Sequence, residues 1–357
     1  MVFLQLHGKL NIDVEGKKVD PITYKLKEKK NFKIGIITTV PIIHATPAAF
    51  YSHQNNRNDY YQIAKDLVNS NFDYFANGGF NLTVSQIDEI KKELELNGYN
   101  IAENKEEITK LNKKIDKVVA INPKQKEGLT PFEMEVTKDD LKLSDFVKKG
   151  IDVLENPEGF FMMVESGMID YASHNNDAKS VISEVTALDN AVKVALEFYN
   201  KHKDETLIIV TGDHETGGMS LGNSTSNYKL NTKILENQKI SYLTLEEYLK
   251  NAKNKNYSFD EVYKYLKENF GLSTTDNSKV YITQTELNKL NAAYQNSTLD
   301  KELIKLMSQK SGIGWTTKDH TASLMTVYSI GVGSENFSGI YNTIELNNKL
   351  MEILKLN

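Results

Sequence analysis

The chain has 357 residues, of which 39% are hydrophobic and 25% charged, with a formal net charge of −5 and no cysteine. This composition is typical of a globular protein, and it excludes disulfides and thiolate metal ligands. The net charge is mildly acidic and the lysines are scattered, so the sequence shows no basic cluster of the kind that binds nucleic acid. No apolar run of the sequence reaches membrane-spanning length.

The first forty residues predict a short N-terminal hairpin, one short helix and then a buried strand. The hairpin turn is expected at 14–19 and the helix at 21–30. Residues 32–40 are β-branched and mostly apolar, which predicts a strand inside a parallel sheet. The start of the chain lacks the basic and apolar regions of a signal peptide.

Two polar side chains follow this first buried strand. His44 and Thr46 lie in the expected strand-to-helix loop, and a helix is predicted from Arg57 to about residue 67. The chain then alternates between strands at 72–75 and 117–121 and helices at 83–97, 103–115 and 141–154. Such alternation predicts an α/β fold with a largely parallel central sheet.

The stretch 160–177 carries the first pattern that indicates chemistry. A strand at 160–165 ends in Glu165, and a helix expected to run to about residue 199 follows it. Asp170 and His174 are four residues apart, so one helix face presents both, and together they could bind one Zn²⁺. The alternative is an aspartate near a helix start with a surface histidine one turn later.

A second buried strand at 206–212 ends in Asp213 and His214, just before two glycines. Adjacent side chains at such a turn can reach one metal from two directions, although a turn aspartate with an exposed histidine is the alternative. His320, taken alone, fits a surface histidine equally well. Because parallel strands of one sheet bring their carboxyl ends together, we expect these polar groups to meet.

Residues 223–312 differ in character from the rest of the chain. They are rich in Asn, Lys, Ser and Thr, with helices predicted at 244–252, 259–269 and 284–294. We interpret them as a polar, mostly helical insertion within one domain that spans 1–357. After the insertion, a last strand at 324–332 and a closing helix at 343–355 are expected.

Four separate motifs, in this order along the chain, resemble the alkaline phosphatase family. They are 43–58, 164–174, 211–218 and 320–321. Several motifs in the right order are more specific than any one of them. The resemblance implies a three-layer α/β/α fold and hydrolysis of phosphate monoesters at a site with two zinc ions and one magnesium ion.

The resemblance also implies a role for each matching residue. Asp170, His174 and His320 match the ligands of the first zinc, and Asp213 and His214 match two ligands of the second.

The remaining matches concern the magnesium and the substrate. Thr46 and Glu165 match magnesium ligands, and His44 matches a position in the shell around that ion. Arg57 matches the arginine that binds the substrate phosphate with its bidentate guanidinium, and so counts among the catalytic residues.

Two family features have no counterpart in the sequence. The family's first strand carries an aspartate that bridges two metals, and the helix after it begins with the serine nucleophile. Here the first serine is Ser52. We therefore expect an N-terminally truncated member that lacks this strand and helix, has an open sheet edge, and is inactive as given.

Alternatives remain for the activity: a phosphodiesterase or sulfatase of the same superfamily, or a non-catalytic zinc-binding remnant. The resemblance is also consistent with a homodimer. For a full-length member it implies a periplasmic or extracellular location.

Overall fold

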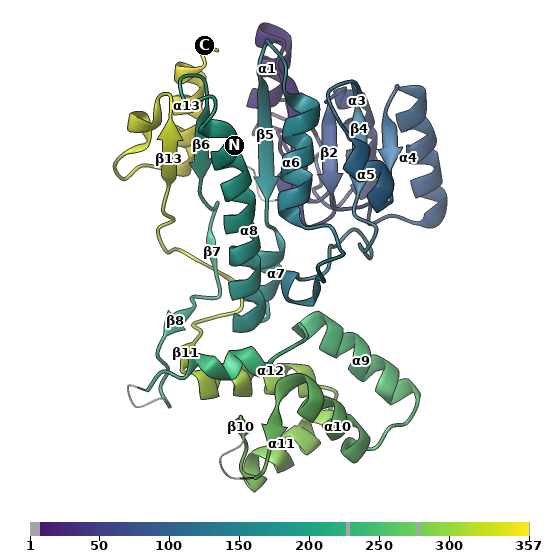
Figure 1. Cartoon of the computed structure of the whole chain (residues 1–357), viewed down its shortest axis with the longest axis vertical. Helices are drawn as coiled ribbons and strands as arrows, with labels where there is room; N and C mark the ends of the chain where they lie inside the picture. Colours follow the sequence, from purple (N-terminus) through teal and green to yellow (C-terminus); the bar gives the residue numbers. More distant parts are fainter. Residues whose placement is uncertain (1–7, 226–228, 276–278, 357) are drawn as a thin grey trace.

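The computed structural model describes residues 8–225, 229–275 and 279–356, and its centre is a parallel sheet of five strands (Figure 1). The strands are β1 (Lys33–Thr38), β2 (Tyr74–Asn77), β3 (Asn100–Ala102), β4 (Val118–Ile121) and β5 (Phe160–Glu165). Their order is β3-β4-β2-β1-β5. The predicted parallel sheet is confirmed, and β3 is the one strand of it that the sequence did not predict.

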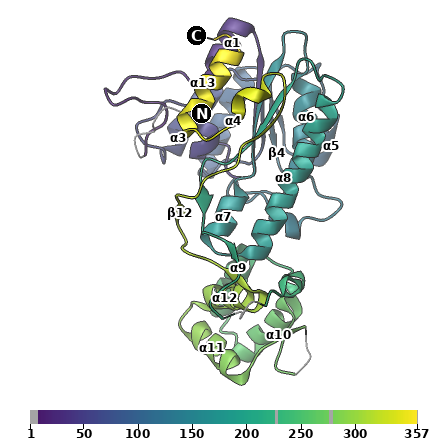
Figure 2. The same cartoon turned by 90° about the vertical axis from the view of Figure 1, so that its left-hand side faces the viewer.

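Helices cover both faces of this sheet, which confirms the three-layer α/β/α prediction (Figure 2). One face packs against α1, α3, α4 and α13, and the other against α5, α6 and α8. The bounds are α1 (Ile22–Lys30), α3 (Tyr60–Ser70), α4 (Val84–Leu96), α5 (Lys105–Lys110), α6 (Leu143–Leu154), α8 (Ala178–Tyr199) and α13 (Thr343–Ile353).

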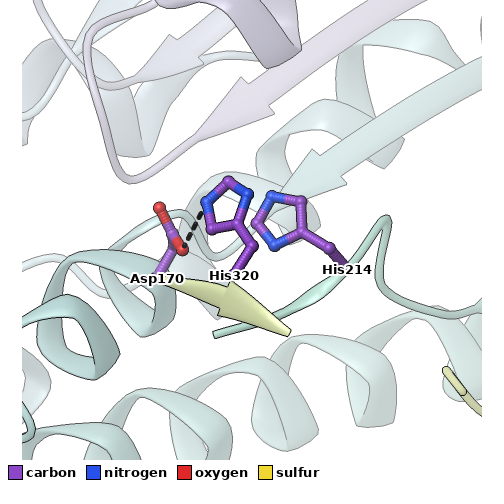
Figure 3. Close-up of side chains that lie close together, drawn as sticks. All are labelled: Asp170, His214 and His320. Atoms are coloured by element: carbon purple, nitrogen blue, oxygen red, sulfur yellow. Dashed lines mark ion pairs between the residues drawn. The ribbon is translucent and has the colours of Figure 1, made fainter. Parts of the chain in front are cut away.

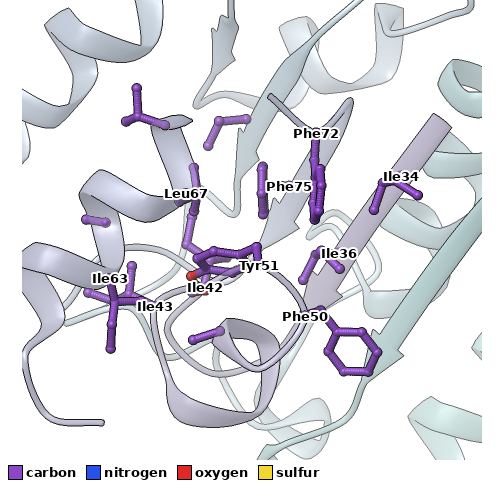
Figure 4. Close-up of a cluster of buried hydrophobic side chains, with 14 of the residues drawn as sticks. Ile34, Ile36, Ile42, Ile43, Phe50, Tyr51, Ile63, Leu67, Phe72 and Phe75 are labelled. Carbon is purple, nitrogen blue, oxygen red and sulfur yellow. Dashed lines mark hydrogen bonds between the residues drawn. The ribbon is translucent and has the colours of Figure 1, made fainter. Parts of the chain in front are cut away.

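The two faces follow from the alternation of side chains along β1. Ile34 and Ile36 are fully buried against the first group of helices, where Phe72, Phe75 and Tyr51 surround them (Figure 4). Ile37, the next residue along, is buried in the cluster on the other face. A strand whose alternate side chains enter two different cores must lie inside the sheet, as its apolar run predicts.

The register of β1 and β5 fixes where the sheet ends. Lys33 pairs with Phe160, and the ladder runs without a bulge to Thr38 opposite Glu165. The carboxyl ends of these neighbouring strands are therefore level. The loop after β1 leads into the short helix α2 (Ala45–Ala48), and the turn after β5 leads into α7 (Met168–His174).

The strand expected at 206–212 does not join this sheet. It forms β6 (Leu207–Val210), which pairs antiparallel with β13 (Tyr328–Gly331) as a separate ribbon. Among the described strands, β5 hydrogen-bonds only to β1. The prediction that all three site-bearing strands share one sheet is therefore wrong, because an apolar run indicates a buried strand but not its partner.

Two predicted helices are shorter than expected. The helix expected from Asp170 to residue 199 is broken between α7 and α8, because Asn176 has a left-handed backbone with φ of 56°. Asp177 then caps α8 by accepting a hydrogen bond from the backbone of Ser180. The helix expected at 103–115 is only α5, because Leu111 leaves the helical conformation.

The described residues between 232 and 311 form a helical layer at the end of the molecule opposite α1 and α13 (Figure 2). It contains η2 (Thr232–Asn237), α9 (Tyr242–Asn254), α10 (Phe259–Phe270), α11 (Gln284–Gln295) and α12 (Leu299–Ser311). Its apolar core includes Met168 and Ala172 of α7. These helices therefore pack directly on the helix that carries Asp170 and His174.

The remaining elements are short. They are two 3₁₀ helices and six two-residue strands: η1 (Glu133–Glu135), η3 (Ser334–Phe337), β7 (Glu215–Thr216), β8 (Ser220–Leu221), β9 (Leu272–Ser273), β10 (Val280–Tyr281), β11 (Ile313–Gly314) and β12 (His320–Thr321). Within the described ranges, no helix is both long and apolar enough to cross a membrane.

A buried glutamate on α8 makes a testable prediction about stability. Glu184 is 2% exposed and accepts a hydrogen bond from the backbone of Glu133 at 2.6 Å. Burial raises the pKa of Glu184 from 4.5 to about 7. Because the folded pKa lies above the unfolded one, the stabilisation is complete below pH 4.5 and is lost as the pH rises through 7.

We therefore expect Glu184→Gln to be more stable than the parent at pH 8 by about 2–3 kcal/mol. At pH 4 the two proteins should unfold alike. Urea denaturation at both pH values measures the difference, and Glu197→Gln on the exposed face of the same helix is the control. An equal stability gain at both pH values would contradict the titration argument.

Candidate metal centre

The centre lies where β1 and β5 end, since the last residues of the two strands pair with each other. There the hydroxyl of Thr38 donates a hydrogen bond to the carboxylate of Glu165. Burial and the charges of Asp213 and Asp170 raise the pKa of Glu165 to about 7, although hydrogen bonds from Thr38 and Thr46 oppose the rise. A half-buried carboxyl beside two other carboxylates is a group that a bound cation would stabilise.

Helix α7 presents Asp170 and His174 on one face, as their spacing predicts. Nε2 of His174 lies 3.4 Å from Oδ2 of Asp170. The other ring nitrogen, Nδ1, contacts the backbone carbonyl of Lys318. Because a carbonyl oxygen can only accept, Nδ1 carries the proton and Nε2 keeps a lone pair for a metal.

A two-stranded ladder brings His320 to the same place. Strand β12 pairs antiparallel with β7, so that His320 lies opposite Thr216 and Thr321 opposite Glu215. The hydroxyl of Thr321 donates to the carboxylate of Glu215, and this bond holds the ladder closed. His214 immediately precedes β7, and its ring stacks on His320 with centroids 3.5 Å apart.

Asp170, His214 and His320 form the tightest group of metal-ligating atoms among the described residues (Figure 3). One ligand atom of each lies within 4.8 Å of the others. Nε2 of His320 is 3.8 Å from Oδ1 of Asp170. Burial and the neighbouring His214 lower the pKa of His320, which favours the neutral ring that a metal needs. Two imidazoles and one carboxylate suit zinc.

Other residues singled out in the sequence lie around this group. Oδ2 of Asp213 is 3.4 Å from Nε2 of His214. The charge of Asp213 contributes to the pKa shifts of both Glu165 and His44. The charge of Arg57 likewise lowers the pKa of His44.

His44 has a buried ring nitrogen that lacks a hydrogen-bond partner among the described residues. The residue precedes α2, and the nitrogen is Nδ1. Burial and the charge of Arg57 lower the pKa of His44 to about 4, so the ring is neutral at pH 7. A buried imidazole nitrogen without a protein partner fits a water molecule held by a metal ion.

The sequence analysis missed Thr216, which connects the two predicted zinc-ligand sets. Its hydroxyl donates to Oδ1 of Asp170 at 2.6 Å and lies 3.2 Å from Nδ1 of His214. A hydroxyl has one proton, so Nδ1 of His214 must donate to the threonine oxygen, which leaves Nε2 free for a metal. Thr216 is two residues after His214 in an extended segment, so the two-residue period of a strand could have revealed it.

Thr38 was missed for a different reason. It ends β1 and is fully buried, so in the sequence it is one more β-branched residue of a core strand. Only the register with β5 shows that its hydroxyl meets Glu165.

The hydrogen bonds of Thr216 lead to a prediction about metal affinity. We expect Thr216→Val to weaken zinc binding about 10- to 100-fold, because Asp170 and His214 lose the group that orients both. Thr216→Ser retains the hydroxyl and is the matched control. A chelator competition titration measures both constants. Equal affinities for the valine and serine variants would show that the hydroxyl does not orient the ligands.

Comparison with known proteins finds a family model, described as alkaline phosphatase, that matches residues 5–77 and 78–356. Alkaline phosphatase 4 of Bacillus subtilis is 30% identical over 357 residues, which cover 97% of this chain and 72% of that protein. Alkaline phosphatase 3 of the same organism is 29% identical, over 97% of this chain and 73% of that protein.

Solved structures give the same result. The cold-active alkaline phosphatase of Shewanella sp. superposes with a TM-score of 0.83 at 27% identity, over 97% of this chain and 81% of the other. A mutant of the TAB5 alkaline phosphatase, with Mg bound in its M3 site, gives a TM-score of 0.67 at 25% identity. That match covers 98% of this chain and 80% of the other.

Proposed function

Since this chain belongs to the alkaline phosphatase family and is therefore a hydrolase of the phosphomonoesterase type, we propose that its centre uses two zinc ions and one magnesium ion. The observation that carries this proposal is the convergence of Asp170, His214 and His320 near the half-buried Glu165. When bound, such ions neutralise the phosphoryl oxygens and activate the attacking oxygen.

We assign Asp170, His174 and His320 to the first zinc and Asp213 and His214 to the second. The first set offers three protein ligands, the number typical of catalytic zinc, and the second offers two, so we expect the first site to bind more tightly. The short distances between Asp170, His214 and His320 support metal binding where the two sets meet. Thr216, bonded to one member of each set, would hold the two sites in register.

The magnesium would lie on the side of Glu165 and Thr46. Carboxylate and hydroxyl oxygens are hard ligands that suit this ion. Glu165 would then be ionised by the cation in spite of its burial, with Thr38 holding one of its oxygens. His44, through its unpaired Nδ1, would accept a hydrogen bond from a water molecule on the ion.

Four described hydroxyl groups near this centre are each engaged in a hydrogen bond. Thr38 donates to Glu165, Thr216 donates to Asp170, and Thr46 hydrogen-bonds to Glu165. Ser166, next to Glu165 in the sequence, turns away and donates to the backbone oxygen of Glu184. We propose that the described residues bind and orient a phosphate monoester but supply no nucleophilic hydroxyl.

Three further properties are part of the proposal. A homodimeric state and the periplasmic or extracellular location of a full-length family member come from the family resemblance. One domain over 1–357 with an insertion at 223–312 comes from the polar composition of that stretch.

The function is tested first through phosphate binding, which does not require turnover. We expect the zinc- and magnesium-loaded protein to bind inorganic phosphate, and Arg57→Ala to weaken this binding about 10- to 100-fold, because a charge-assisted bidentate contact is lost. Arg57→Lys should retain part of the affinity. Calorimetry gives the constants, and metal analysis should show the same zinc content in all three proteins. If the alanine variant binds phosphate as tightly as the parent does, Arg57 does not contact the phosphate.

A second prediction concerns turnover of an aryl phosphate. Because we propose that the described residues supply no nucleophilic hydroxyl, we expect hydrolysis about 10⁴- to 10⁶-fold below that of a complete phosphatase. The same assay with an aryl phosphodiester and an aryl sulfate separates the two alternative substrate classes. Fast monoester turnover that His320→Ala abolishes would show that another group serves as nucleophile.

A further inference from the structure

A cavity of about 370 Å³ lies beside the metal centre, between α7 and α9. Two leucines and two tyrosines form the apolar part of its lining: Leu129, Leu243, Tyr171 and Tyr242. His174 and Glu246 add an imidazole and a carboxylate to the lining. The volume is at the lower end of the range of small-molecule pockets. It has room for one ring or a short alkyl group rather than for a polymer.

The cavity and the metal centre share a wall. His174 lines the cavity, while its Nε2 lies 3.4 Å from Oδ2 of Asp170. Tyr171, on the same helix, meets His44 edge to face with ring centroids 6.3 Å apart, and the charge of Arg57 acts on it. A phosphate held by Arg57 and the metals would therefore have the cavity next to it.

The wall contributed by α9 is fixed in place. Tyr242 is 7% exposed, and its backbone N–H donates to the buried Asp177 at 2.9 Å. Its ring packs edge to face on Phe132, with centroids 5.8 Å apart. A rigid aromatic wall offers contact area without a large loss of side-chain entropy, which favours binding of an apolar group.

Glu246 adds a charge preference to this apolar cavity. It is exposed on α9 and lines the cavity together with Leu243. A carboxylate there repels a second negative charge on the substrate and tolerates neutral or cationic groups.

From these contacts we infer that the cavity binds the alcohol part of the substrate and selects aryl or short alkyl phosphates without a second negative charge. The inference rests on the proposed function, because it places the phosphate at the metal centre. The helices at 232–311 then take part in substrate selection through α9, while the metal ligands lie outside them.

Phosphonates test the cavity because their carbon–phosphorus bond resists hydrolysis, so binding is read without turnover. We expect the zinc-loaded chain to bind phenylphosphonate about tenfold more tightly than methylphosphonate, from burial of the ring. Leu243→Asp places a charge in the lining at a partly exposed position and should bring this ratio close to one. Leu230→Asp, at a position 51% exposed outside the cavity lining, is the matched control and should leave the ratio unchanged.

A charge reversal at Glu246 tests the inference independently. 4-Carboxyphenylphosphonate should bind the parent several-fold more weakly than phenylphosphonate, and Glu246→Lys should reverse this order. Equal affinities for phenyl- and methylphosphonate, with no effect of Leu243→Asp or Glu246→Lys, would overturn the cavity inference alone. Failure of both phosphonates and of inorganic phosphate to bind would instead overturn the proposed function.

Discussion

The crowding of carboxylates at the end of β5 is the constraint on which the rest of the centre depends. Glu165 is half-buried, and burial together with the charges of Asp213 and Asp170 raises its pKa to about 7, so a cation beside it would favour its ionised form. A metal that binds the folded chain and not the unfolded chain removes this repulsion and adds its binding free energy to stability. Metal binding and folding of this region are therefore coupled.

Hydrogen bonds within the protein orient two of the histidines for metal binding. His174 and His214 each have Nδ1 held by an oxygen, from the Lys318 backbone and from Thr216 respectively, so the same nitrogen, Nε2, is left for a metal in both rings. Thr216 donates its own hydroxyl hydrogen bond to Asp170. Ligands oriented in this way lose little freedom on binding, which raises affinity without any additional ligand.

The sequence alone predicted the strands, and the shared helix face of Asp170 and His174, better than it predicted how the strands are connected. Apolar, β-branched runs revealed β1 and β5, and the four-residue spacing placed Asp170 and His174 on one helix face, as observed. The antiparallel pairing of β6 could not be predicted, because pairing is a property of two segments. The same holds for Thr38 and Thr216, whose importance comes from contacts with Glu165 and Asp170 in distant segments.

Helix α7 faces two environments, and this has a consequence for specificity. One side presents Asp170 and His174 to the metal centre, while Met168 and Ala172 pack into the core of the helical layer. That layer supplies α9 as a wall of the cavity next to His174. Substitutions on the cavity side of α9 can thus change which alcohol fits without touching a metal ligand. Substitutions in the shared core would shift α7 and so disturb metal binding and alcohol selection together.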